Sequence, residues 1–244
     1  MKNLLKRFIK SSKLFEVSMI FVGITLSMQF DNWNEARKLK QREMELLSAI
    51  YLDLSADFED LNGVIQNFDE FYIEPIKYLD SCLRCTKPVD FNHLGKPIVF
   101  PIGGTFMDQN KGAYECFKYD GATLVKDNRL KIKLFDYYEA KLSWVDQHQS
   151  WQEEYRDEYV YPLYMKYTNN ESSHISCENY LKMRNDKHVH VILYQWKTSY
   201  IKNQKVHREL LPILLDLKSD VEKELVANGI DPKQILKEAK STIS

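Results

Sequence analysis

The chain has 244 residues and a formal net charge of −1, from 34 basic and 35 acidic side chains. This near-neutral balance carries no information about the cellular compartment. The four cysteines are too few for a disulfide-dense secreted scaffold. Motifs of common enzyme classes are also missing: the sequence has no nucleophile elbow, phosphate-binding loop, dinucleotide fingerprint or His-Glu-x-x-His pair. We therefore do not expect an enzyme.

The first element is an apolar stretch over residues 14–33, LFEVSMIFVGITLSMQFDNW, which follows a basic flank over residues 1–13. A basic start, an apolar centre and the lack of a small-x-small cleavage site predict a retained transmembrane helix. The uncharged part, residues 17–30, is only about 21 Å long, against a hydrocarbon core of roughly 30 Å. Snorkelling lysines and a locally thinned bilayer would have to supply the difference. A cleaved signal peptide and a buried helix of a soluble domain are the alternatives.

Polar and small side chains lie on two faces of this predicted helix. Glu16, Gly23, Ser27 and Asp31 share one face, and a second polar stripe lies roughly opposite. Polar groups in hydrocarbon need partners, and small residues at such spacing favour close packing of helices. The pattern predicts a homo-oligomer in which one face contacts other copies and the other lines a pore. The alternative is a single anchor whose hydroxyl groups bond back to their own helix.

A long charged helix is predicted to continue directly from the apolar stretch. Over residues 34–80 the apolar side chains recur every three or four positions. Such a stripe packs against the C-terminal half of the same chain or against sister helices in a coiled coil. Because this amphipathic stalk continues the apolar helix, it can transmit a rotation from the body to the membrane. The stripe consists of Leu47, Ile50, Leu54, Phe58, Leu61, Ile65, Phe68 and Tyr72.

The remaining chain divides into a loop-rich connection over residues 81–112, which is rich in Pro and Gly, and a helical soluble domain over residues 113–244. Asp120-Gly121 predicts the end of a short helix, with glycine at the C-terminal position. Asp127 is placed to cap a long helix. We expect three further helices, at 177–206, 208–226 and 231–240. The predicted fold is mainly α: a transmembrane helix continuous with a long stalk helix, then a compact helical domain.

Two segments resemble a widespread, largely uncharacterised group of small bacterial membrane proteins. FVGITLSMQFDNWNEARKLKQRE and LSAIYLDLSAD match its Gly-containing apolar span, Asn-Trp-Asn-Glu motif and charged helix. AYECFKYDGATLVKDNRLKIKLFDYYE matches its spaced Tyr, Gly, Asn-x-x-Leu and Tyr-Tyr positions. Together the matches cover about 60 residues. Ser27 and Asp31 depart from the usual Ala and Asn, which makes this span more polar. The resemblance to this group implies no particular chemical activity.

The layout is also similar to single-span membrane effectors of anti-phage systems, notably the channel effector of the Hailong system. This similarity implies an ion channel in the bacterial inner membrane, with the soluble domain in the cytoplasm and a homo-oligomer such as a tetramer. It also implies a nucleotidyltransferase encoded alongside and a ligand that closes the pore. Basic residues flank both ends of the apolar stretch, so the sequence itself does not fix the sidedness.

The strongest ligand-binding candidate is the basic segment 182–208, which contains seven Lys or Arg and one Asp. Cations with an interleaved aromatic ring suit a phosphate backbone and a stacked base. The segment therefore predicts a nucleotide or single-stranded oligonucleotide ligand. A solvated helix face and a patch attracted to anionic lipids are the alternatives. The predicted binding face consists of Lys187, His190, Tyr194, Lys197, Lys205 and Arg208.

Cys82 and Cys85 form a Cys-x-x-Cys pair that is compatible with half of a zinc site, a redox pair or plain thiols. Cys116 and Cys177 add no second paired motif, so the sequence favours plain thiols, without a metal or cofactor. The chain is thus predicted to be an oligomeric membrane effector, an ion channel gated by a nucleotide or oligonucleotide. A passive membrane-anchored scaffold is the alternative.

Overall fold

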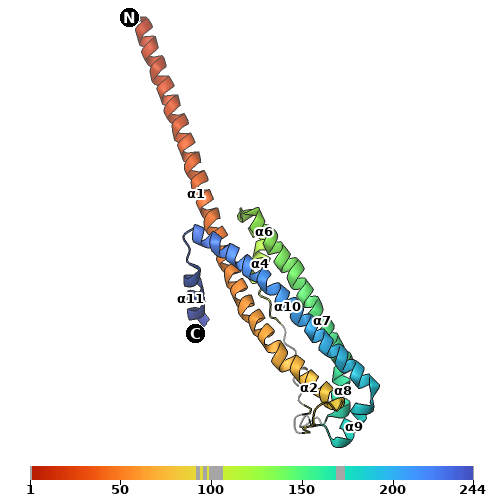
Figure 1. The fold of residues 1–244 in the computed structure, drawn as a ribbon. Helices are drawn as coiled ribbons and strands as arrows, with labels where there is room; N and C mark the ends of the chain where they lie inside the picture. The colour runs from red at the N-terminus through yellow and green to blue at the C-terminus, as the bar shows by residue number, and fades with distance from the viewer. Residues whose placement is uncertain (1, 92–93, 96–97, 99–106, 169–173, 244) are drawn as a thin grey trace.

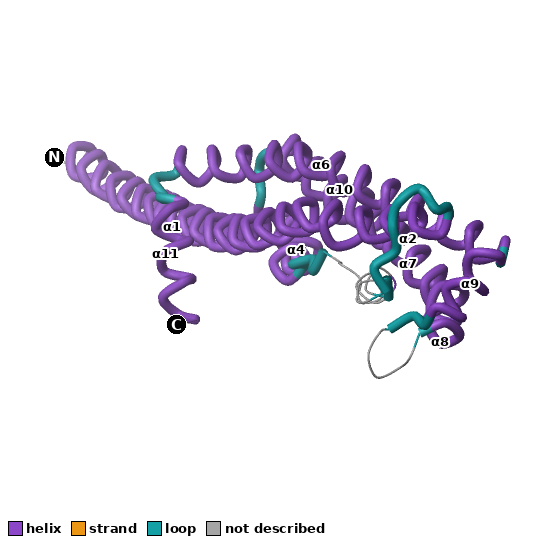
Figure 2. Tube along the Cα trace, turned by 60° about the horizontal axis from the view of Figure 1, so that its bottom comes forward, coloured by secondary structure: helices purple, strands orange, loops and turns teal. Residues whose placement is uncertain are grey.

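The computed structural model describes the chain except for residues 1, 92–93, 96–97, 99–106, 169–173 and 244. Side chains are described from Glu16 to Ser241, apart from Val17 and these gaps. Every regular element in the described part of the chain is helical (Figure 2), which confirms the mainly α prediction. Much of the predicted loop-rich connection lies outside the described residues.

Helix α1, Lys2–Asn67, is a single helix of 66 residues. Its N-terminal part projects from the body as a free rod, whereas its C-terminal part lies within the body (Figure 1). A π-helical turn η1, Phe68–Ile73, and helix α2, Glu74–Leu83, continue the path. The predicted continuity of apolar stretch and stalk is therefore correct. Among the described residues, however, no helix has a stretch that is both long and apolar enough to cross a membrane. The predicted transmembrane helix over residues 14–33 thus has no support from the structure.

The body is an elongated helical bundle in which α1, α7 and α10 run side by side (Figure 1). Its stalk stripe packs against the C-terminal half of the same chain: Leu47, Ile50 and Leu54 are fully buried in a core shared with α10. The remaining elements are α4 Gly112–Cys116, η3 Phe117–Gly121, α5 Ala122–Leu124, α6 Asn128–Phe135, η4 Asp136–Lys141, α7 Leu142–Tyr155, η5 Arg156–Val160, α8 Tyr161–Tyr167, α9 Cys177–Asn185, α10 Lys187–Ala227 and α11 Pro232–Ile243.

The predicted boundary between helices 177–206 and 208–226 is wrong. The chain breaks earlier, at Asp186, whose side chain accepts a hydrogen bond from the backbone N–H of His188 at 2.9 Å and so caps α10. Helix α10 then continues for 41 residues through Pro212. The tail helix after Asp231 and the cap at Asp127 are confirmed, since Asp127 accepts hydrogen bonds from Arg129 and Leu130.

Gly121 does not end a helix, contrary to the sequence prediction. Its backbone is helical, with φ near −72°, and the chain stays helical to Leu124. A Cβ at this position would lie 2.3 Å from Cδ2 of Leu46 on α1. A side chain here would therefore displace Leu46, because η3 approaches α1 closely.

Three aspartates on one face of α1 hold the incoming segment 108–113 against the body. Asp53 accepts a hydrogen bond from the backbone N–H of Ala113 at 2.9 Å, and Asp60 accepts one from Asp108 at 2.8 Å. Asp57 is fully buried between them. Its carboxylate accepts two bonds from Asn110 and one from the hydroxyl of Tyr137, each at 2.9 Å. These bonds position the start of α4 on the stalk.

Candidate ligand-binding groove

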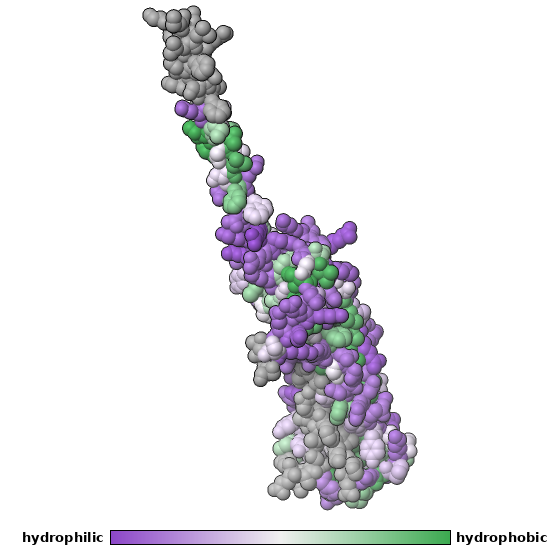
Figure 3. All heavy atoms as spheres, turned by 90° about the vertical axis from the view of Figure 1, so that its left-hand side faces the viewer, coloured by the Kyte–Doolittle hydropathy of each residue, from purple (hydrophilic) through white to green (hydrophobic). Residues whose placement is uncertain are grey.

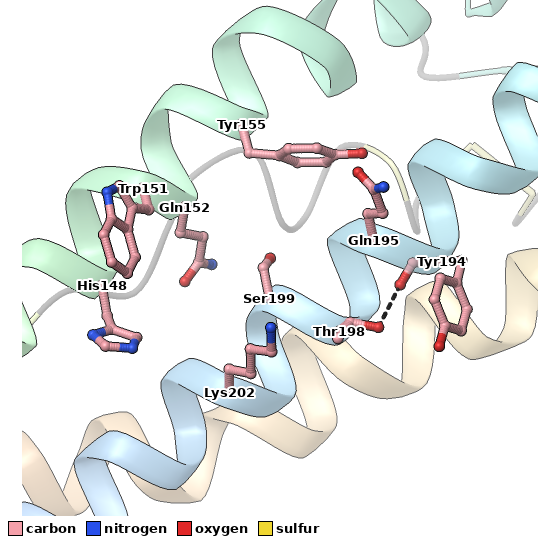
Figure 4. Close-up of a pocket in the computed structure, with 9 residues that line it drawn as sticks. All are labelled: His148, Trp151, Gln152, Tyr155, Tyr194, Gln195, Thr198, Ser199 and Lys202. Atoms are coloured by element: carbon pink, nitrogen blue, oxygen red, sulfur yellow. Dashed lines mark hydrogen bonds between the residues drawn. The ribbon is translucent and has the colours of Figure 1, made fainter.

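A groove with a volume of about 440 Å³ lies between α7 and α10, on the body far from the rod (Figures 1 and 4). Two of the three longest helices in the described structure form its walls, so its shape depends on well-packed elements. Figure 4 shows side chains from both helices pointing into the space between them. The groove is lined by His148, Trp151, Gln152, Tyr155, Tyr194, Gln195, Thr198, Ser199 and Lys202.

The α7 wall carries His148 and Trp151, and Trp144 continues this row of rings just outside the lining. Trp144, His148 and Trp151 follow one another at the spacing of a helix face. The ring centroids are 4.4 Å apart for Trp144 and His148, and 5.3 Å apart for His148 and Trp151. Trp151 exposes 52% of its surface although it is among the most apolar residue types. Exposed rings held in a row offer flat surfaces on which a planar ligand can stack.

Tyr155 closes one end of the groove. Its hydroxyl donates a hydrogen bond to the backbone carbonyl of Ile192 on α10 at 3.3 Å, so the side chain bridges the two helices. Burial raises the pKa of Tyr155 to about 12, with a smaller contribution from neighbouring Tyr159. The phenol therefore stays protonated and remains a hydrogen-bond donor at neutral pH.

Polar groups on α10 face the aromatic wall. The hydroxyls of Thr198 and Ser199 bond back to the carbonyls of Tyr194 and Trp196, at 2.8 and 2.7 Å. By contrast, the Gln195 amide and the Lys202 ammonium form no hydrogen bond or ion pair with described residues. They are therefore available to a ligand. One free cation opposite aromatic rings favours an aromatic ligand with an anionic group.

A layer of buried polar side chains lies directly behind the groove. Gln152, at the groove floor, accepts a hydrogen bond from the side-chain amide of Asn203. His207 is one turn further along α10 and is fully buried. Its Nδ1 lies 2.8 Å from the backbone carbonyl of Asn203, so this nitrogen donates, and its Nε2 lies 3.3 Å from the Gln149 amide and accepts. Burial lowers the pKa of His207.

This polar layer touches the end of the stalk. The His207 ring centroid is 5.4 Å from that of Phe68, the first residue of the π-helical turn that follows α1. The Oδ1 of Asn203 and the Nε2 of Gln204 are buried without a hydrogen-bond partner among the described residues. The groove floor is thus connected to the point where α1 ends, through the Gln152–Asn203 hydrogen bond, the carbonyl of Asn203 and the rings of His207 and Phe68.

The structure brings one of the six predicted binding residues to this groove. Tyr194 lines it and exposes 59% of its surface. Lys197 lies outside the lining, with its Nζ 5.7 Å from the centroid of the Tyr194 ring and 4.0 Å from a carboxylate oxygen of Asp80 on α2. His190 contacts the backbone carbonyl of Arg184 at 2.9 Å. Lys187 is exposed at the first turn of α10.

Acidic side chains accompany the other predicted cations. Arg208 lies 3.4 Å from Asp69 of η1, and Lys205 lies 3.7 Å from Glu209. The surface formed by segment 182–208 is therefore less basic than its sequence suggests, because acids outside the segment approach it. Exposed pairs of this kind contribute little to stability. The face does point outward as predicted, since Val189, Trp196 and Val206 are buried on the opposite side of α10.

The four predicted packing or pore residues lie on the rod. Glu16, Gly23, Ser27 and Asp31 are all exposed, and a side chain added at Gly23 would meet no atom within 4 Å. Thr25 bonds back to its own helix, donating to the carbonyl of Phe21 at 2.8 Å. The single chain therefore leaves this face without a partner.

The cysteines are free thiols, with Cys82 buried and the other three exposed. Within the described residues, no group of three or more His, Cys, Asp or Glu is arranged to hold a metal ion.

Sequence reasoning did not identify the aromatic wall or the role of Lys202 opposite it. The available signal was the segment WVDQHQSW, in which Trp144, His148 and Trp151 recur at intervals of four and three between polar residues. This spacing puts three rings on one helix face.

Comparison with known protein families, curated proteins and solved structures finds no match for this chain.

Proposed function

We propose that the chain is a self-assembling membrane effector whose helical body binds an aromatic anion of the nucleotide class. One observation carries this proposal. From Ile20 to Trp33 the rod is rich in large apolar side chains that contact nothing in the body (Figure 3). Phe21 and Phe30, for example, expose 73% and 65% of their surfaces. Exposed apolar side chains gathered on one short segment mark an interaction site for protein or lipid, and Ser27, Gln29 and Asp31 lie between them.

The same helix supports a coupling between body and rod. Leu47, Ile50 and Leu54 of α1 are fully buried in the body, so a change in packing there displaces the rod as a continuous element. The groove is connected to the end of α1 through Asn203, His207 and Phe68. A ligand in the groove can shift the rod only if it binds two states of the body with different affinity.

The groove supports a nucleotide or a short oligonucleotide as the ligand. Its volume of about 440 Å³ is within the range of small-molecule sites. Trp151 offers a stacking surface for a base, Gln195 offers an amide for a base edge, and Lys202 offers a cation for a phosphate. The groove has no paired nucleophile and base, which favours binding over catalysis.

The specific form of effector that we propose is an ion channel in a bacterial inner membrane, with the body in the cytoplasm. Glu16, Ser27 and Asp31 share one exposed rod face, and acidic rings of this type favour cations in other channels. The resemblance to the Hailong effector adds a role in anti-phage defence, a tetrameric assembly and a nucleotidyltransferase as partner.

Purified full-length protein would test this proposal in three steps. Light scattering in detergent measures the oligomer, flotation with anionic and neutral vesicles measures lipid binding, and ion flux from vesicles measures conduction with and without a nucleotide. We expect an oligomer, vesicle binding and flux that Glu16→Leu with Ser27→Leu suppresses. Vesicle binding without flux at any ligand concentration would support the passive scaffold instead. A monomeric protein that does not bind vesicles would refute both the channel and the scaffold.

A further inference from the structure

An open cleft with a volume of about 960 Å³ lies where α1 leaves the body. One wall is α1, with Leu39 and Arg42, and the other is formed by α4, η3 and α5. Tyr119, on the second wall, exposes 87% of its surface. The cleft is far along the molecule from the aromatic groove and shares no lining residue with it.

The cleft continues onto the rod. A second hollow of about 380 Å³ runs along α1 from Asp31 to Arg42 and shares Leu39 and Arg42 with the cleft. Asp31 also belongs to the face that the sequence predicts for helix packing. One side of α1 therefore presents a continuous surface from the predicted packing stripe into the body.

The two walls carry complementary charges that the single chain leaves unsatisfied. Arg42 lines the cleft on α1 and Asp120 lines it on η3, but neither forms an ion pair with a described residue. Leu39 and Tyr119 supply exposed apolar surface between them. The α1 wall also carries Glu45, so the complementarity rests on the unpaired Arg42 and Asp120 on facing walls, with apolar side chains between them.

We infer that the cleft is an interface between copies of this chain and that it receives helix α1 of a neighbouring copy. Arg42 of one copy then contacts Asp120 of the next. When copies stand parallel around a rotation axis, these side chains lie at the same height, and head-to-tail contacts of this kind close into a ring. This inference rests on the proposed self-assembly and adds where the copies meet.

Cysteine cross-linking between two differently tagged chains tests the contact directly. Both chains carry Cys85→Ser and Cys177→Ser. One keeps Cys116, which lies exposed in the cleft, and the other carries Cys116→Ser with Leu39→Cys. After co-expression and mild oxidation, we expect a disulfide-linked dimer that carries both tags. The matched control replaces the second chain by one that keeps native Cys177, at the opposite end of the body, and changes Cys116 to Ser.

The outcomes separate this inference from the proposed function. Wild-type protein that is oligomeric by light scattering but gives no two-tag dimer would place the interface elsewhere and overturn the inference alone. Wild-type protein that is monomeric would overturn the self-assembly as well. A two-tag dimer of equal yield with the Cys177 control would show random collision and would also overturn the inference.

Charge reversal gives a second test with its own control. Arg42→Glu should weaken assembly about tenfold, because it places like charges across the interface. Adding Asp120→Arg to this variant should restore assembly, whereas Asp120→Arg alone should weaken it. Circular dichroism of each variant checks that the body is folded. Equal assembly of all four proteins would refute the pairing of Arg42 with Asp120.

Discussion

His207 lies in the middle of the body, and its surroundings suit only the neutral imidazole. Its Nδ1 donates to the carbonyl of Asn203, and its Nε2 accepts from the amide of Gln149. Protonation would turn Nε2 into a donor that faces another donor. Burial and this geometry act in the same direction, since both favour the neutral ring.

The lowered pKa of His207 predicts a loss of stability in mild acid. The unfolded histidine takes up a proton near pH 6.5, whereas the folded one resists protonation, so its contribution is present above about pH 6.5 and is lost as the pH falls through the folded pKa. Denaturant titrations at about pH 7.5 and pH 5.5 would measure this effect. His207→Gln should show a smaller change between the two pH values. An identical pH dependence in variant and wild type would contradict the prediction.

Substitutions inside the aromatic groove should reduce ligand affinity more than substitutions of nearby residues outside it. Trp151→Ala should reduce the affinity for a nucleoside monophosphate or a short single-stranded oligonucleotide by about 1–3 kcal/mol, the range for loss of one stacking contact. Lys202→Gln should reduce the affinity and its salt dependence. Trp144→Ala and Lys205→Gln are matched controls on the same helices outside the groove. Calorimetry across salt concentrations would decide, and equal losses for Trp144→Ala and Trp151→Ala would argue against this site.

Replacing two helical glycines with alanine should change the stability of the fold in opposite directions. A methyl group at Gly63 would meet no atom within 4 Å, whereas at Gly121 it would lie 2.3 Å from Leu46. Gly63→Ala should therefore stabilise the fold by about 0.5–1 kcal/mol, since alanine loses less conformational entropy in a helix. Gly121→Ala should destabilise it, because the Leu46 side chain must move. Thermal unfolding of both variants tests the pair, and a gain in stability from Gly121→Ala would be inconsistent with the close approach of η3 and α1.

At the scale of elements, sequence periodicity predicted helices better than it predicted their ends. The stalk stripe faces the core as expected because it repeats over many turns, although Phe58 and Ile65 are only partly buried. The break at Asp186 was missed because the cap consists of one aspartate within a basic run. The π-helical turns at 68–73 and 136–141 were missed too. A π-helical turn accommodates one extra residue in the helix. At the first of these turns, Phe68, Tyr72 and Ile76 therefore stay buried at successive intervals of four.

The candidate site could be predicted only in part, because it is formed by elements that lie far apart in the sequence. Tyr194 was found because α10 has a regular polar face. The opposite wall of the groove comes from α7, and nothing in the sequence indicates that these two helices lie side by side. The acids near Lys197 and Arg208 also belong to other elements, Asp80 on α2 and Asp69 on η1. Local charge along the chain could not reveal them.

The aspartate contacts of α1 predict a large effect from one substitution. Asp57→Ala would leave the amide groups of Asn110 and the hydroxyl of Tyr137 without their acceptor inside the body. We expect a loss of about 2–4 kcal/mol, because several buried donors lose their partner together. Asp60→Ala, which removes one more exposed bond to the same segment, is the control. Similar unfolding midpoints for the two variants would contradict the central role of Asp57.

At the scale of the whole molecule, the body and the rod depend on different parts of the chain. The core shared by α1 and α10 begins at Met44, so the apolar part of the rod contributes nothing to it. A chain without residues 1–33 should keep a cooperative unfolding transition close to that of the full chain, and should lose assembly and vesicle binding. Circular dichroism and light scattering measure both properties. Assembly of the shortened chain equal to that of the full chain would refute a role for the rod in self-association.

The continuity of α1 also has a geometric consequence. From Met44, where the helix enters the core, to Ser18 is 26 residues, or about 39 Å at the rise of an α-helix. A tilt of about 10° at the core would then move the far end by roughly 7 Å, more than one helical pitch. The rod therefore pivots about the packed core, and its far end moves the most. Adjustments of the body that are too small to disturb its packing are thereby enlarged into displacements comparable to the diameter of a hydrated ion.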